Sequence, residues 1–134
     1  MRSMDTKSEN KILLVDDDQN IIDLYSRVFA EYGFKFSIAK NGREAVEKAE
    51  MEKPSLILLD IMLPDINGFD VLKALKENPA NEKVTIWVLS VLAEQANLDR
   101  ARSLGAEDYL VKSSYTPAQI CEKIQKFFTQ AEEL

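Results

Sequence analysis

Apolar runs and segments of helical periodicity alternate along the chain five times. Each apolar run is short and bounded by polar or turn residues, as in strands that are buried on both faces of a parallel sheet. Between these runs, apolar residues recur at three- and four-residue spacing, which is typical of amphipathic helices. The predicted strands are Ile12–Asp16, Phe36–Ala39, Leu56–Asp60, Thr85–Leu89 and Asp108–Val111. The alternation predicts an α/β fold, in which right-handed crossovers place helices on both faces of a parallel sheet.

Residue types that begin and end helices support this division. Gly33 and Gly105 stand just past two of the helical segments, in the position that favours glycine. Helix starts are predicted by residue types that cap the first turn, at Asn41, Asn67 and Thr116. We therefore expect residues 1–10 to form a flexible polar tail and residues 11–130 to form one domain.

Two of the predicted strands end in acidic residues, one in Asp16 followed by Asp17 and the other in Asp60. In parallel sheets, ligands bind outside the carboxyl ends of the strands. Carboxylates crowded there repel one another and cost stability unless a cation joins them. Mg2+ prefers oxygen ligands, and an aspartate beside it can act as a nucleophile that forms an acyl phosphate. The pattern predicts a metal site beside a reactive Asp60, whereas Asp18 is expected to stabilise the start of the following helix.

Composition narrows the possible functions. The chain has 134 residues, a net charge of -6 at pH 7 and no histidine. The negative charge argues against a nucleic-acid-binding surface, and the lack of histidine excludes acyl-transfer triads and zinc hydrolase sites. The single cysteine, Cys121, excludes an internal disulfide and is expected to be a buried apolar filler. No segment resembles a membrane span or the core of a signal peptide, so we expect a cytoplasmic location.

Two further strand ends carry polar side chains. The Ser90 hydroxyl can donate to a phosphoryl oxygen, although capping a helix is an equally good explanation for a serine at this position. Lys112 would bring an ammonium group to developing negative charge, although most lysines are simply solvated. Phosphoryl transfer depends on positioning and charge neutralisation. Four strand ends thus carry acidic groups at two of them, a hydroxyl at the third and an ammonium at the fourth. Together these groups indicate a phosphoryl-transfer site.

These residues occur within recognisable motifs, namely Val-Asp16-Asp17, Leu-Leu-Asp60-Ile-Met-Leu-Pro-Asp-Ile-Asn-Gly, Leu-Ser90 and Tyr109-Leu-Val-Lys112. In their order and spacing, from about Lys11 to Phe128, they resemble the receiver domain of two-component response regulators. The resemblance implies a flavodoxin-like, three-layer α/β/α fold with a doubly wound five-stranded parallel sheet of order 2-1-3-4-5. It also implies a signalling switch, which catalyses only its own phosphorylation and dephosphorylation. The phosphoryl donor would be a sensor histidine kinase or a histidine phosphotransfer protein.

The resemblance also implies a role for each residue. Asp60 would be the phosphoacceptor, with Ser90 and Lys112 contacting the phosphoryl group. Tyr109 would be the aromatic residue that turns inward when the hydroxyl of Ser90 engages that group, so the two form the switch. Mg2+ would be held by Asp16, Asp17, Asp60 and the backbone carbonyl of Met62.

The chain departs from the usual pattern of the family at two positions. The family usually has a cis proline after the lysine, whereas this chain has Ser113. A cis bond before serine costs about 3 kcal/mol more than trans, which favours a trans bond and a shifted loop around Lys112. Val91 is larger than the residue usual after the switch hydroxyl, and together with Met62 and Leu92 it is expected to hinder the attacking water. We therefore expect slow self-dephosphorylation.

The output of such a switch would be read on the face formed by residues 94–103, strand Asp108–Val111 and the last helix. The expected partners are a downstream effector protein or domain, with the chain as a monomer or a phosphorylation-dependent homodimer and without direct nucleic-acid or membrane binding. The alternative is a constitutive interaction module with a receiver fold and no phosphorylation. Enzymatic alternatives fit poorly, because a phosphatase would need an aspartate in place of Met62 and the phosphate-binding loop of an NTPase is absent.

Overall fold

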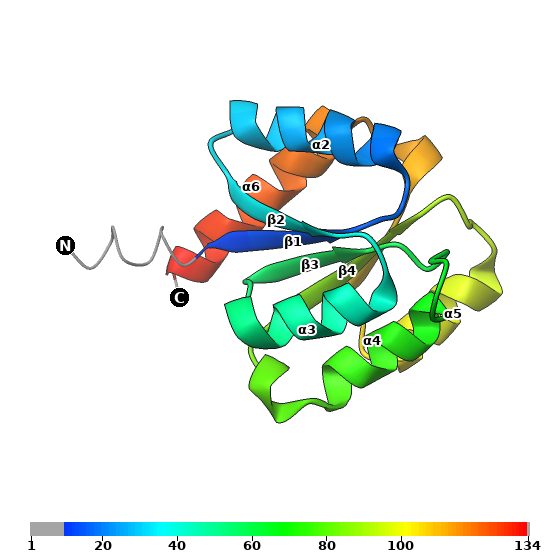
Figure 1. Cartoon of the computed structure of the whole chain (residues 1–134). Coiled ribbons are helices and arrows are strands. Elements are labelled where there is room, and N and C mark those ends of the chain that lie inside the picture. Colours follow the sequence, from blue (N-terminus) through cyan, green and yellow to red (C-terminus); the bar gives the residue numbers. More distant parts are fainter. Residues whose placement is uncertain (1–9, 134) are drawn as a thin grey trace.

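A computed structural model describes residues 10–133 of the chain as a five-stranded parallel sheet between two layers of helices (Figure 1). Along the sheet the strands follow the order β2-β1-β3-β4-β5, which confirms the predicted fold class and strand order. The strands are β1 (Lys11–Val15), β2 (Lys35–Ala39), β3 (Leu56–Leu59), β4 (Thr85–Ser90) and β5 (Asp108–Val111). The expected N-terminal tail lies outside the described residues except for Asn10.

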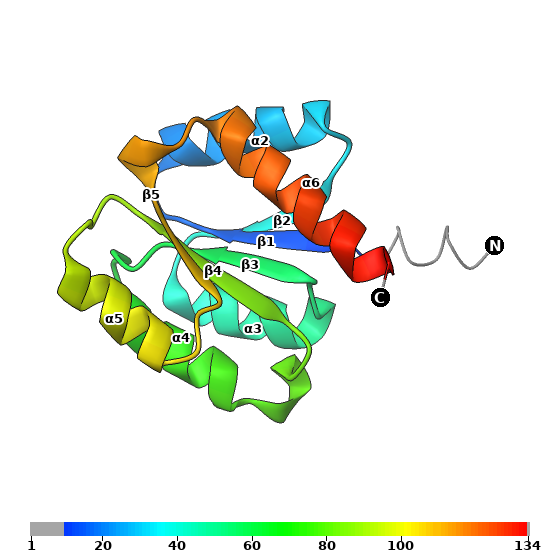
Figure 2. The same cartoon turned by 180° about the vertical axis from the view of Figure 1, so that it is seen from behind.

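The helices divide between the two faces of the sheet. Figures 1 and 2 show α2 (Gln19–Glu31) and α6 (Pro117–Glu133) on one face. The other face carries α3 (Gly42–Glu52), α4 (Gly68–Glu77) and α5 (Gln95–Ser103). Short 3-10 turns, η1 (Pro79–Asn81) and η2 (Lys112–Ser114), precede β4 and α6. None of the helices within residues 10–133 has the length and apolar character needed to cross a membrane.

Each strand contributes to two apolar cores, because successive side chains point to opposite faces of a sheet. On β1, Ile12 and Leu14 belong to the core under α2 and α6, where Phe29 is fully buried. Leu13 and Val15 belong to the core under the other three helices. Since both faces are covered, the strands read in the sequence as continuous apolar runs rather than as alternating ones.

The predicted helix boundaries are confirmed in detail. Gly33 and Gly105 follow α2 and α5 with φ values of 76° and 107°, which favour glycine. The Asn41 side chain accepts a hydrogen bond from the Glu44 N–H at 2.9 Å, at the start of α3. Before α6, a capping box joins Thr116 to Gln119 through two reciprocal hydrogen bonds, and Cys121 is buried as expected.

The strand ends differ slightly from the prediction, which placed Asp16 and Asp60 within their strands and ended β4 at Leu89. Regular pairing of β1 and β3 ends one residue earlier, at Val15 and Leu59. Both carboxylates therefore project from the first residue beyond the sheet, and Ser90 is still part of β4. This places the two acids in the loops that line the carboxyl edge of the sheet.

Replacement of Phe29 by alanine should destabilise the fold strongly. Its ring is fully buried and contacts the rings of Tyr25, Phe34 and Phe36. Loss of a buried phenyl ring leaves a cavity and typically costs about 3–5 kcal/mol. Urea unfolding should show this loss for Phe29→Ala. The control Met51→Ala, at a side chain that is 80% exposed on α3, should change the free energy of unfolding by less than about 0.5 kcal/mol.

Candidate phosphoryl-transfer and metal site

The structure brings together the acids that follow β1 and β3. The two strands are paired in register, with Val15 opposite Leu59, so the next residues Asp16 and Asp60 emerge at the same edge. The Asp60 N–H donates to the Val15 carbonyl at 3.0 Å, which extends this alignment by one residue. Carboxylate oxygens of Asp16, Asp17 and Asp60 lie within 4.8 Å of one another. Three residues from two separate loops thus form one oxygen-rich cluster.

The three carboxylates differ in exposure. Asp16 is 1% exposed and Asp60 is 6% exposed, whereas Asp17 is exposed to solvent. The Asp18 N–H donates to one oxygen of Asp16 at 2.9 Å, and the Met62 N–H donates to Oδ1 of Asp60 at 3.0 Å. Each buried carboxylate therefore accepts one hydrogen bond from a backbone N–H, which fixes the orientation of the carboxylate.

Asp18 turns away from this cluster, as expected. Its side chain accepts a hydrogen bond from the Asn20 N–H at 2.9 Å and forms the N-cap of α2. Of three consecutive acids, two face the site and one stabilises the helix start.

The ammonium group of Lys112 lies between the two buried carboxylates. Its Nζ is 2.8 Å from Oδ2 of Asp16 and 3.3 Å from Oδ2 of Asp60. The described residues contain no cis peptide bond, so the Lys112–Ser113 bond is trans and the chain continues into η2. The departure from the family's proline therefore leaves the lysine side chain in the site.

Burial and charge shift the pKa values of this pair. Burial raises the pKa of the Asp60 carboxyl, helped by the nearby charge of Asp16 and opposed by the Met62 N–H and by Lys112. Burial by itself would lower the pKa of Lys112, but its hydrogen bond to Asp16 and the charges of Asp60 and Asp16 raise it overall. Lys112 therefore remains a cation at neutral pH.

Ser90 and Tyr109 meet through the loop that follows β4. The Ser90 hydroxyl is fully buried and accepts a hydrogen bond from the Leu92 N–H at 3.3 Å. It does not cap a helix, because α5 begins later, with Glu94 as its N-cap residue. The Tyr109 hydroxyl donates to the Leu92 carbonyl at 2.8 Å, and burial raises the pKa of this phenol. Leu92 therefore joins the two residues.

Two residues shape the loop after Asp60: Gly68, which the sequence indicated as a turn residue, and Asp65, whose role sequence reasoning missed. The Gly68 N–H donates to the Ile61 carbonyl at 2.9 Å, and a Cβ on this glycine would collide with the backbone of Ile61. Asp65 accepts hydrogen bonds from two backbone N–H groups at the start of α3. The requirement for glycine is visible in the motif, but the partner of Asp65 lies far away in the sequence and has no local signal.

The chemistry of the cluster suits a magnesium ion. Mg2+ prefers hard oxygen ligands and retains several of its own waters, so it needs few protein ligands and an open side. A depression of about 450 Å³ adjoins the cluster and is lined by Asp17, Met62, Phe69 and Leu92, among others. The exposed carboxylate of Asp17 borders this depression, so the oxygen donors and the room for water occur together.

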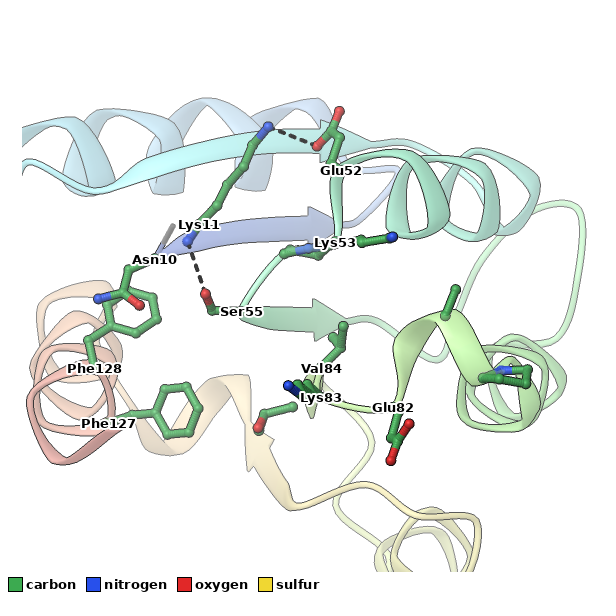
Figure 3. A pocket seen from close by; sticks show the side chains of 14 residues that line it. Asn10, Lys11, Glu52, Lys53, Ser55, Glu82, Lys83, Val84, Phe127 and Phe128 are labelled. Carbon is green, nitrogen blue, oxygen red and sulfur yellow. Dashed lines mark hydrogen bonds and ion pairs between the residues drawn. The ribbon is translucent and has the colours of Figure 1, made fainter. Parts of the chain in front are cut away.

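A second hollow lies at the opposite end of the sheet and takes no part in this chemistry. It measures about 1000 Å³ and opens at the amino ends of β1, β3 and β4 (Figure 3). In it, Lys11 forms an ion pair with Glu52 at 3.0 Å, and Ser55, Phe127 and Phe128 also line the hollow. It contains none of the residues singled out as candidate site residues.

Replacement of Asp60 by asparagine should stabilise the metal-free protein at neutral pH. Because the folded-state pKa of Asp60 is raised, the folded protein retains this proton at pH values where the unfolded chain has lost it. Stability is therefore lost as pH rises from the ordinary pKa of an aspartate through the raised pKa of Asp60 in the folded protein. In EDTA, Asp60→Asn should melt above the wild type at pH 7, and the difference should shrink toward pH 4. If the difference in melting temperature between Asp60→Asn and the wild type were the same at pH 4 and pH 7, it would contradict the raised pKa of Asp60.

Comparisons with known proteins agree with this geometry. The family model of the response regulator receiver domain matches residues 12–125. The alkaline phosphatase synthesis transcriptional regulatory protein PhoP of Bacillus subtilis is 34% identical over 124 residues, which cover 91% of this chain and 50% of PhoP. The chain thus spans about half the length of the curated relatives that it matches.

Solved structures show the same similarity. A CheY-like receiver domain protein from Methanospirillum hungatei aligns with a TM-score of 0.81 at 30% identity, over 92% of this chain and 97% of that one. The BeF3-activated N-terminal receiver domain of RstA from Klebsiella pneumoniae aligns with a TM-score of 0.80 at 28% identity, over 89% of this chain and 98% of its own. This chain therefore belongs to the family of response regulator receiver domains.

Proposed function

We propose that this chain is a phosphorylation-activated signalling switch, which accepts a phosphoryl group on Asp60 in a Mg2+-dependent reaction. The family implies a sensor histidine kinase or a histidine phosphotransfer protein as the donor, and the chain has no histidine of its own that could serve instead. The observation that carries the proposal is the Lys112 ammonium group in contact with both buried carboxylates, Asp16 and Asp60. This arrangement supplies a nucleophile, a metal-binding acid and a cation within one small site.

Asp16, Asp17, Asp60 and the backbone carbonyl of Met62 are the proposed ligands of Mg2+. Bound there, the ion would neutralise charge on the phosphoryl oxygens and on the crowded carboxylates. The cluster of carboxylate oxygens within 4.8 Å supports this assignment. Asp17 is the exposed member and borders the depression, so it is the ligand through which an ion would enter from solvent.

In the proposed reaction, a carboxylate oxygen of Asp60 forms a bond to phosphorus while the bond from phosphorus to the donor's imidazole nitrogen breaks. The electron pair of that bond stays on the nitrogen, so no external oxidant or reductant is required. Lys112 balances the negative charge that accumulates on the transferred group. Its raised pKa supports this role, because it keeps the side chain protonated throughout.

The conformational switch consists of Ser90, Leu92 and Tyr109. If the Ser90 hydroxyl turns toward a phosphoryl group on Asp60, the hydrogen bond that it accepts from the Leu92 N–H weakens. The Leu92 carbonyl holds the Tyr109 hydroxyl, so a shift of Leu92 is passed on to Tyr109 on β5. The change is read on the face formed by α5, β5 and α6, as a shift between two conformations.

The remaining assignments rest on the family and on the acidic composition of the chain. We propose residues 11–130 as the receiver domain, acting in the cytoplasm as a monomer or as a phosphorylation-dependent homodimer. Its output goes to an effector protein or domain, and the chain itself contacts neither nucleic acid nor membrane. It catalyses only its own phosphorylation and dephosphorylation.

A constitutive interaction module with the same fold is the alternative function. The absence of the family's proline after Lys112 favours it, whereas the contacts of Lys112 with both carboxylates oppose it. Calorimetric titration with Mg2+ and with beryllofluoride distinguishes the two functions. A folded protein that binds neither ligand would be the constitutive module.

Acetyl phosphate with Mg2+ should add one phosphoryl group to the wild-type protein, visible as a single mass increase in intact-protein mass spectrometry. Asp60→Asn should remain unlabelled, because an amide is not a comparable nucleophile. Asp17→Asn should need more Mg2+ to reach the same labelling rate, since it loses one anionic ligand. Equal labelling of wild type and Asp60→Asn would refute the phosphoacceptor assignment.

The phosphoryl group on Asp60 should be long-lived in the isolated, Mg2+-loaded protein. Met62 and Val91 are 54% and 59% exposed, and Leu92 lines the depression beside Asp60, so apolar side chains surround the approach of the attacking water. Val91→Ala should shorten the lifetime by opening this approach, whereas Met51→Ala on a remote part of α3 should leave it unchanged. Loss of the label within seconds from the wild type would contradict the prediction.

A further inference from the structure

The loop between β3 and α4 lies over the proposed site and is largely exposed. It carries Met62, whose N–H donates to Asp60 and whose carbonyl is a proposed metal ligand. Its far end is fixed where the Gly68 N–H donates to the Ile61 carbonyl at 2.9 Å. Between these points Leu63 packs partly against the core, whereas Met62, Asp65 and Ile66 are exposed. A segment with so few buried contacts opens easily, so a further interaction is needed to hold it in one conformation.

Asp65 supplies this interaction through both of its carboxylate oxygens. Oδ1 accepts a hydrogen bond from the Gly42 N–H at 2.8 Å, and Oδ2 accepts one from the Arg43 N–H at 3.1 Å. These donors are the first two amides of α3, while the next free amide, that of Glu44, is taken by Asn41. The hydrogen bonds from Gly42 and Arg43 lower the pKa of Asp65, so the carboxylate is ionised at neutral pH.

The junction between this loop and α3 has no spare room. A Cβ on Gly42 would approach Cγ2 of Val71 and would lie 3.1 Å from Cβ of Ile66. Helix α3 is packed against β1, β2 and α4, and Gly42 in its first turn is buried, so this end of the helix is held in place. The hydrogen bonds that Asp65 accepts from this end of α3 therefore restrict the motion of the loop between β3 and α4.

We propose that Asp65 is a positioning residue for the phosphorylation site, which holds the loop carrying Met62 in the conformation that binds Mg2+. This inference rests on the proposed function. Asp65 is not one of the proposed metal ligands, because it lies outside the cluster of Asp16, Asp17 and Asp60 and its two oxygens face the start of α3. Without these hydrogen bonds, the loop would have to be ordered when the ion binds, and that cost would appear as weaker Mg2+ binding.

Calorimetric titration of the metal-free protein with Mg2+ tests this proposal. Asp65→Ala should raise the Kd for Mg2+ about tenfold, as is common when a group that orients a metal ligand is removed. Asp65→Asn retains one acceptor oxygen and should fall between Asp65→Ala and the wild type. The matched control is Asp70→Ala, which removes one exposed acidic group from the first turn of α4 and should change the Kd by less than about twofold.

A second readout separates positioning from simple loss of stability. With acetyl phosphate, Asp65→Ala should need about tenfold more Mg2+ for half-maximal labelling, yet reach a wild-type rate at saturating Mg2+. Urea unfolding in EDTA establishes whether each variant is folded under the assay conditions. If Asp65→Ala is unfolded, Asp65→Asn is used for the test instead.

The outcomes that overturn the proposal are distinct. Folded Asp65→Ala and Asp65→Asn proteins that bind Mg2+ as tightly as the wild type would show that Asp65 only caps α3. A reduced labelling rate that persists at saturating Mg2+ would also contradict a positioning role toward the metal. A wild-type protein that neither binds Mg2+ nor becomes labelled would contradict the proposed function itself, and this inference with it.

Discussion

The contact of one ammonium group with two buried carboxylates is the interaction on which the site depends. Asp16 and Asp60 are almost completely buried, and two unpaired negative charges at such positions would be strongly destabilising. Lys112 compensates for part of this charge from the end of β5. The compensation is incomplete, because the pKa of Asp60 remains raised and Asp17 adds a third carboxylate. The cluster therefore retains an attraction for a divalent cation.

This residual negative charge links stability to the proposed function. A core that was optimised for stability alone would not place carboxylates at the ends of two adjacent strands. The parallel sheet makes the arrangement possible, since the carboxyl ends of β1 and β3 lie side by side with their loops free to face solvent. A bound cation or a phosphoryl group would change the balance of charge there, and the hydrogen bonds among Ser90, Leu92 and Tyr109 lie within reach of that change.

Most of the fold and the main acids were predictable because their signals are local. Buried strands leave continuous apolar runs, helix ends leave glycine and asparagine, and the carboxyl ends of parallel strands converge at one edge. Asp16, Asp17 and Asp60 were identified by their places after such runs, and the structure brings them together. The predicted strands ended one residue too late at β1 and β3 and one residue too early at β4, because the apolar run alone does not show where regular strand pairing ends.

The sequence by itself determined which residues stand at the strand ends, since hydrophobic periodicity and terminating residues act over a few positions. Only the tertiary structure decided how remote segments meet. Asp65 accepts a hydrogen bond from the Gly42 N–H, 23 residues away on α3. The Tyr109 hydroxyl donates to the Leu92 carbonyl, 17 residues away. Whether Lys112 reaches the acids without a proline after it depended on the course of η2. Such contacts depend on rotamers and on the packing of whole helices, for which a linear sequence carries no local signal.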